Sequence, residues 1–453
     1  NSGNYIQNTT STQATSNFNI SGEGAANILN AAMQYNLGGS RVLTTSSFFG
    51  NLFAGIGAGG SPTSSGQSNS FFGNQAGQSN LTGGANSFFG RNAGNSNTGG
   101  GNNSFFGESS GFGTSTGGQN SFFGQFSGRN NITGNENAFF GYRAGANNTA
   151  SGNSFFGSGS GDSVTSGGFN AFFGRSSGAA VITGFGNSFF GDNAGLSTTA
   201  SQNSFFGRRA GVANTTGEFN SFFGYATGDS NTTGVRNTYF GSNAGSTNTD
   251  GDDNSFFGNA AGRMTNAAGS LFNGAGNTFL GANAGETNTA GSNNVFVGRF
   301  AGNTNTTGRF NTLIGRAADV GTGDLEFATA IGAGAVVTTN QTVVLGRSSD
   351  SVKIPGPVFI EGQVQINAAT SIEHLTLPNI AAGQLCITAD HGVVRCLGSL
   401  APSDQSTKEN IDNRTQIERH KKQIAEMRQQ IDELKKLVCL QSPNADVCMK
   451  EEE

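Results

Sequence analysis

The pentapeptide Asn-Ser-Phe-Phe-Gly occurs at residues 69–73, 86–90, 103–107 and 120–124, and it decides the fold. Looser copies continue as far as residues 342–346. The glycines that end these copies, here called closing glycines, fall at positions 50, 73, 90, 107, 124, 141, 157, 174, 191, 207, 224, 241, 258, 281, 298, 315, 332 and 346. Twelve of the seventeen intervals between them are 17 residues long, which identifies an internal repeat.

Each repeat continues from Asn-Ser-Phe-Phe-Gly to an Ala-Gly pair and then to Asn-Thr-Thr-Gly, as at residues 214–217 and 231–234. The first block predicts a short strand, and Ala-Gly marks a second short segment. Asn-Thr-Thr-Gly predicts a turn, because Asn and Gly adopt positive φ easily. Two short strands and two turns within 17 residues predict one coil of a β-solenoid. A helical repeat would not tolerate this much glycine.

Neighbouring residues of a strand point to opposite faces, so the two Phe rows are expected on different sides of the solenoid. The first Phe shares a face with Asn, and we expect both in the interior, with Asn side chains hydrogen-bonded from coil to coil. This inner row includes Phe71, Phe88, Phe105, Phe122 and Phe189. The second Phe shares its face with Ser and is expected outside; this outer row includes Phe72, Phe89, Phe106, Phe123 and Phe190.

The outer row predicts that the chain associates with copies of itself. About a dozen outward aromatic residues at ~150 Å² each would expose roughly 2,000 Å². Monomers rarely expose apolar patches larger than about 300–600 Å². The alternative is that both Phe rows lie inside one wide solenoid.

The composition excludes several other classes of protein. The chain has 73 Gly, 39 Phe and no Trp, only 12% of its residues are charged, and its net charge is −5. This charge gives no basic field for nucleic acid, and no apolar run is long enough to predict a membrane span. The three histidines lie far apart, so we predict no metal site, no cofactor and no enzymatic activity. Because the chain begins with Asn1 and carries four cysteines in close pairs, we interpret it as a mature, secreted chain with disulfides.

The repeats at residues 44–350 resemble the head repeats of trimeric autotransporter adhesins and similar segments of phage tail-fibre-type proteins. The closest copies are residues 328–332 and 342–346. The 17-residue period and the double Phe depart from the pattern of that family. The resemblance implies a homotrimeric β-roll, whereas the outer Phe row alone implies only more than one chain.

Five segments are expected: residues 1–45, the solenoid at 46–350, a small β-neck at 351–402, a coiled coil at 403–441 and a tail at 442–453. The polar N-terminal segment contains Tyr5, Ile6, Phe18 and Ile20, and we expect it to dock on a neighbouring trimer; folding back on its own shaft is the alternative. The fold class is therefore all-β with a helical tail.

The neck and the coiled coil carry the cysteines and a heptad pattern. Asp390-His-Gly392 predicts a hairpin turn that places Cys386 opposite Cys396, an arrangement that would allow a cross-strand disulfide. Cys439 and Cys448 would close a loop or link chains. The heptad seam consists of Ile417, Ile424, Met427, Ile431, Leu434 and Val438.

Residues 403–411 resemble the opening of the self-cleaving intramolecular chaperone at the end of phage tail fibres. The resemblance implies Ser403 and Lys408 as a catalytic pair. Ser406 and Thr407 replace the Arg-Leu of that motif, and only 42 residues follow, which is too few for the chaperone body. We interpret the segment as a linker into the coiled coil, with autocleavage as the alternative.

The expected function is that of an extracellular filament subunit, built from homotrimers that join head to tail. A tail-fibre-like receptor-binding spike or a surface adhesin, with a cell-surface or glycan ligand, is the alternative. A polysaccharide depolymerase is disfavoured, because the coils lack paired carboxylates at recurring positions.

Overall fold

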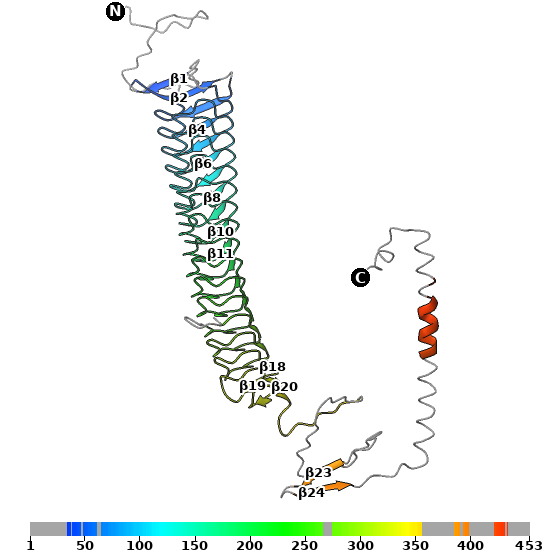
Figure 1. Cartoon of the computed structure of the whole chain (residues 1–453). Coiled ribbons are helices and arrows are strands. Elements are labelled where there is room, and N and C mark those ends of the chain that lie inside the picture. The colour runs from blue at the N-terminus through cyan, green and yellow to red at the C-terminus, as the bar shows by residue number, and fades with distance from the viewer. Residues whose placement is uncertain are drawn as a thin grey trace, which may run out of the picture. The chain divides into compact units, whose positions relative to one another are not determined.

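The computed structural model describes residues 34–37, 39–46, 49–60, 65–265, 274–355, 385–389, 393–397, 421–430 and 433. The chain divides into two compact units, residues 1–355 and 356–453, which are treated separately. The first unit is a single β-solenoid, as the repeat predicts (Figure 1). Its coils stack along one axis, and each coil of the main shaft contributes one short strand to a parallel ladder.

The ladder contains eighteen parallel strands, which are joined by seventeen steps from coil to coil. The strands are β3 (Asn51–Ala54), β4 (Ser70–Phe72), β5 (Ser87–Phe89), β6 (Ser104–Phe106), β7 (Ser121–Phe123), β8 (Ala138–Phe140), β9 (Ser154–Phe156), β10 (Ala171–Phe173), β11 (Ser188–Phe190), β12 (Ser204–Phe206), β13 (Ser221–Phe223), β14 (Thr238–Phe240), β15 (Ser255–Phe257), β16 (Thr278–Leu280), β17 (Val295–Val297), β18 (Thr312–Ile314), β20 (Thr329–Ile331) and β22 (Val343–Leu345).

Two antiparallel strands extend the sheet at its N-terminal end. β2 (Ser40–Ser46) pairs with β3, and β1 (Gln34–Leu37) pairs with β2. Because β2 occupies the outer edge of β3, the first coil does not end in an unpaired strand.

The inner Phe row forms one stack of rings through the solenoid. From Phe71 to Phe296 the ring centroids of successive coils lie 4.6–4.9 Å apart, and Tyr239 takes one place in the stack. These side chains are fully buried. The spacing equals the distance between neighbouring strands of a sheet, so the ladder itself sets the ring separation.

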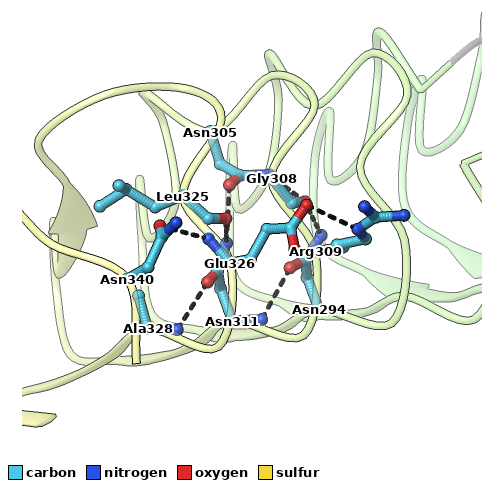
Figure 2. Close-up of polar contacts among 9 residues, drawn as sticks. All are labelled: Asn294, Asn305, Gly308, Arg309, Asn311, Leu325, Glu326, Ala328 and Asn340. Carbon is cyan, nitrogen blue, oxygen red and sulfur yellow. Dashed lines mark hydrogen bonds and ion pairs between the residues drawn. The ribbon is translucent and has the colours of Figure 1, made fainter. Parts of the chain in front are cut away.

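A row of asparagines runs beside this stack and replaces the backbone bonds that a longer strand would make. Each Asn Oδ1 accepts a hydrogen bond from the backbone N–H of the next Asn, as between Asn294 and Asn311 at 2.9 Å. In most coils its Nδ2 donates to a carbonyl of the next coil, as from Asn294 to Gly308 at 2.8 Å. Figure 2 shows the end of the row, where Asn311 accepts from the N–H of Ala328 at 2.9 Å. The predicted coil-to-coil bonding of buried Asn is confirmed.

A glycine six residues after each inner aromatic residue makes room for its ring. A Cβ built on Gly128 would lie 2.4 Å from the ring of Phe122, and the same clash recurs from Gly59 to Gly302. These glycines also have φ near +57° in most coils, a region that favours glycine. Where the inner residue shrinks to Leu313 or Ala330, the sixth residue after it is Asp319 or Val336.

The prediction of a second strand in every coil is wrong for most of the described shaft. It forms only where that glycine is replaced, as β19 (Asp319–Val320) and β21 (Val336–Val337), which pair in parallel. Elsewhere the residue two places after the closing glycine and the later glycine both have positive φ, as at Gln75 and Gly77, so the chain turns twice instead of extending.

Tyr239 is the one phenol in the described part of the inner stack. Asn248 donates a hydrogen bond from Nδ2 to its hydroxyl. Burial raises the pKa of Tyr239 far above its usual value, while the bond from Asn248 opposes this shift. The tyrosinate form is therefore strongly disfavoured in the folded shaft.

The second unit contains one hairpin and one short helix among its described residues. β23 (Leu385–Ala389) and β24 (Val393–Leu397) are antiparallel, and their register places Cys386 opposite Cys396, as the sequence predicts. The helix covers residues 421–430 (Figure 1).

We predict that Gly128→Ala destabilises the shaft, because its Cβ would meet the Phe122 ring and its φ is +56°. The expected loss is about 3 kcal/mol in the free energy of unfolding, measured by guanidinium unfolding followed by circular dichroism. Gly99→Ala is the matched control, since its Cβ would meet only Thr82 Oγ1, at 3.3 Å, and this change should be nearly neutral. Equal losses in the two variants would contradict the role assigned to the Phe–Gly contact.

We also predict that Tyr239 makes the shaft sensitive to alkali. Its pKa in the unfolded chain is about 10, and its folded pKa is higher. Its contribution to stability is therefore complete below pH ~10 and is lost as the pH rises above that value. Tyr239→Phe should raise the alkaline limit of folding, whereas Tyr225→Phe, at a half-exposed ring, should leave it unchanged. Ionisation of Tyr239 without unfolding, followed by tyrosinate absorbance, would be inconsistent with this account.

Candidate association surface

From Gly73 onward, the residue that directly precedes each closing glycine points away from the solenoid interior. Together these side chains form a continuous apolar column, here called the outer stripe. It consists of Phe72, Phe89, Phe106, Phe123, Phe140, Phe156, Phe173, Phe190, Phe206, Phe223, Phe240, Phe257, Leu280, Val297, Ile314, Ile331 and Leu345. The alternation along each strand fixes this direction, because the central residue of the strand points inward. In the first coil Ala54, before Gly55, is in register with Phe72, so the prediction that Gly50 closes that coil is wrong.

The aromatic part of the outer stripe is itself a stack. From Phe72 to Phe223 the ring centroids of successive coils lie 4.6–4.7 Å apart. The rings cover one another's faces and present their edges to solvent. The stack loosens at Phe240, whose centroid lies 5.6 Å from that of Phe223 and 6.3 Å from that of Phe257. Beyond Phe257 the stripe becomes aliphatic.

Mutual stacking reduces the apolar area that the outer stripe exposes. Rings from Phe72 to Phe223 are half-buried, whereas Phe240 is 55% and Phe257 39% exposed. If about a quarter of each ~200 Å² side chain stays exposed, the seventeen positions together expose on the order of 850 Å². This is less than half of the area expected from the sequence, yet it still exceeds the largest patch of a typical monomer.

The predicted division of the two Phe rows is confirmed. Phe71, Phe88, Phe105, Phe122 and Phe189 are fully buried in the chain's own core. The second members of these pairs, Phe72, Phe89, Phe106, Phe123 and Phe190, all belong to the outer stripe. The alternative of both rows inside one wide solenoid is wrong, because the coil has room for one ring only.

Two of the predicted seam residues lie on the described helix. Ile424 and Met427 are three positions apart, so they share one face, and both are exposed. The remaining predicted sites lie outside the described residues: Ser403, Lys408, Ile417, Ile431, Leu434, Val438, Cys439, Cys448, Tyr5, Ile6, Phe18 and Ile20.

A set of exposed aromatic residues lies at the corner that precedes the strand and was not predicted from the sequence. Phe169, Phe219, Phe310 and Phe327 all have φ between +54° and +59°, and Phe169 is 76% exposed. A positive φ is uncommon for a bulky residue. The signal was present in the sequence, since each of these residues stands five positions before a closing glycine.

Across the described residues, no group of three or more His, Cys, Asp or Glu side chains is placed to hold a metal ion. Asp319 is a half-buried carboxylate of the last coils, and its partial burial raises its pKa. Its oxygens accept hydrogen bonds from the N–H of Thr304 at 3.0 and 3.1 Å and from Thr304 Oγ1 at 2.8 Å, so Asp319 joins two coils.

Comparison with known proteins identifies no relative: no protein-family model and no curated protein matches the chain. Within the part of the chain that the structure describes, none of the helical segments has the length and apolarity needed to cross a bilayer. The geometry of the shaft therefore carries the functional argument.

Proposed function

We propose that this chain is a structural, non-enzymatic subunit of an extracellular filament, and that it acts as a parallel homotrimer held together along the outer stripe. The observation that carries the proposal is the outer stripe itself. It runs the length of a regular shaft, and water contacts it at every coil. A stripe of this shape is best covered by an equally long and regular surface, and another copy of the same chain supplies one.

The size of the stripe supports a stable contact. An exposed area on the order of 850 Å² per chain matches the ~800 Å² per partner of a standard protein interface. The ring edges that face solvent would pack against the same stripe of the neighbouring chains and be removed from water. The inner stack makes the shaft rigid, so association does not first have to order it.

The number three comes from the resemblance of the repeats to trimeric adhesin heads. The C-terminal helix supports association of some order, because Ile424 and Met427 form an exposed apolar pair on one face. Such a pair in a heptad pattern is typical of a coiled-coil seam.

Joining of trimers end to end would turn the rod into a filament. The last strand of the ladder, β22, has exposed apolar residues, with Val343 65% and Leu345 47% exposed. Val336 in the same end coil is 47% exposed. Unpaired strand edges with apolar residues favour contact with another chain. Of the predicted docking segment 1–45, β1 and β2 already pair on their own shaft, as the fold-back alternative has it. The residues before β1, from a neighbouring trimer, are the proposed partner of the C-terminal end.

A surface adhesin is the second candidate, and the corner Phe residues favour it. Phe169, Phe219, Phe310 and Phe327 lie in one column and leave apolar rings in water. Exposed apolar side chains that gather on one surface mark interaction sites. In that case these rings would contact a cell-surface or glycan ligand.

We predict that Phe240→Glu combined with Phe257→Glu converts the trimer into monomers. These two rings are the most exposed and least tightly stacked members of the aromatic stripe, so their loss should harm the monomer fold little. In the trimer, the carboxylates of all chains would be buried together around the axis, and their mutual repulsion would oppose association. The measurement is sedimentation velocity, with circular dichroism to check folding.

Ile132→Glu is the matched control. Ile132 is as exposed as Phe240 but lies in a turn away from the outer stripe, so its replacement should leave the mass unchanged. Loss of the trimer in the control as well, or a double variant that stays trimeric, would refute association through the outer stripe.

Electron microscopy tests the filament. We expect long uniform filaments at neutral pH, with a shaft of about 80 Å in each repeat, and shorter particles after deletion of residues 1–17. Separate rods of trimer mass in the full chain would instead favour the adhesin or spike.

A further inference from the structure

Charged residues of opposite sign line the two sides of the outer stripe. The column directly after the closing glycines, here called the basic flank, carries Arg91, Arg175, Arg208, Arg299, Arg316 and Arg347 against Glu108 and Asp192. The columns five and six residues before the closing glycines, here called the acidic flank, carry Glu136, Glu218, Asp252, Asp253 and Glu326 against Arg236 and Arg309.

The chain direction places these flanks on opposite sides of the stripe. In every coil the acidic flank precedes the strand, and the basic flank follows it. Because all strands of the ladder are parallel and in register, residues of one flank stack into one column along the shaft. The sign of each flank therefore persists over many coils.

Ion pairs within one chain neutralise only part of each flank. Asp192 lies between Arg175 and Arg208, at 3.0 and 3.6 Å, and one carboxylate there faces two guanidinium groups. Arg316 is exposed on the same flank. On the acidic flank, Arg309 binds Glu326 at 2.7 Å (Figure 2), and Arg236 binds Asp253 at 2.6 Å. Glu136 and Glu218 add negative charge that neither of these arginines meets.

We propose that the basic flank of one copy lies against the acidic flank of the next, so that the copies close into a ring around a common axis parallel to their shafts. This inference rests on the proposed association through the outer stripe and names the contacts on either side of it. Rotation about an axis parallel to the shaft always brings one flank of a copy to the opposite flank of its neighbour. The contact is then heterologous and closes by rotation.

An antiparallel face-to-face dimer would bring like flank to like flank. Arginine columns would then face each other, as would acidic columns, and like charges at an interface are unfavourable. The outer stripe gives an independent argument, because it is aromatic up to Phe257 and aliphatic from Leu280. Antiparallel copies would set rings against shorter aliphatic side chains, whereas parallel copies match them level by level.

The flanks select orientation more than they add strength. The arginine side chains are well exposed, at 67% for Arg175 and 63% for Arg208, and exposed ion pairs contribute little each. Rim charges mainly steer association and exclude wrong arrangements. Assembly should therefore become slower with rising salt, while the apolar stripe continues to hold assembled trimers.

A charge-swap experiment tests the pairing. Arg208 stands one coil before Glu218, on the opposite flank, so parallel copies place the two at nearly the same level. The variants are Arg208→Glu, Glu218→Lys and the combination of both in one chain. We expect each single change to weaken trimer formation about fivefold per contact at low salt, and the combination to restore it. Analytical ultracentrifugation over a concentration series measures both effects.

The outcomes separate this inference from the proposal beneath it. A wild-type chain that stays monomeric overturns both. A trimer whose stability is unaffected by the single changes, or is lowered additively by the pair, refutes the flank contact and leaves association through the outer stripe intact. Stronger association of Arg208→Glu would indicate like flanks in contact and also refute the inference. Circular dichroism of each variant excludes loss of fold as the cause.

Discussion

The contact between an inner aromatic ring and the glycine six residues later determines the rest of this solenoid. The ring lies flat over that glycine, where a Cβ would approach within 2.3–2.6 Å in the shaft. The coil can therefore close around a single ring. Flat rings at 4.6–4.9 Å match the strand spacing of the ladder, so neither the stack nor the ladder has to distort the other.

This constraint also explains how the shaft ends. In the last coils the ring is replaced by Leu313 and then by Ala330, and the glycine becomes Asp319 and then Val336. With a smaller interior residue the chain no longer has to turn at that point, so the short strands β19 and β21 appear. The final step between closing glycines shrinks to 14 residues, and the core narrows with it.

Strand alternation was sufficient to predict which Phe lies inside and that buried Asn joins the coils, because both follow from a period of two. The second strand could not be predicted by the same rule. The strand is absent because residues such as Gln75 and Arg143 adopt positive φ. Their side-chain types do not predict this conformation. The exposed area of the outer stripe was overestimated for a related reason: pattern alone does not show that Phe72 and Phe89 cover each other's faces.

A parallel ladder differs from most protein surfaces in that its two sides are never equivalent. Each coil enters its strand past one column of residues and leaves past another, and in-register stacking repeats the difference along the whole shaft. A column can thus accumulate one sign of charge from single substitutions in separate coils, as Arg175, Arg208 and Arg316 do. Such a surface has an inherent polarity. Self-association through the stripe between the two columns would transmit that polarity to the assembly, and a filament needs this property if every subunit is to point the same way.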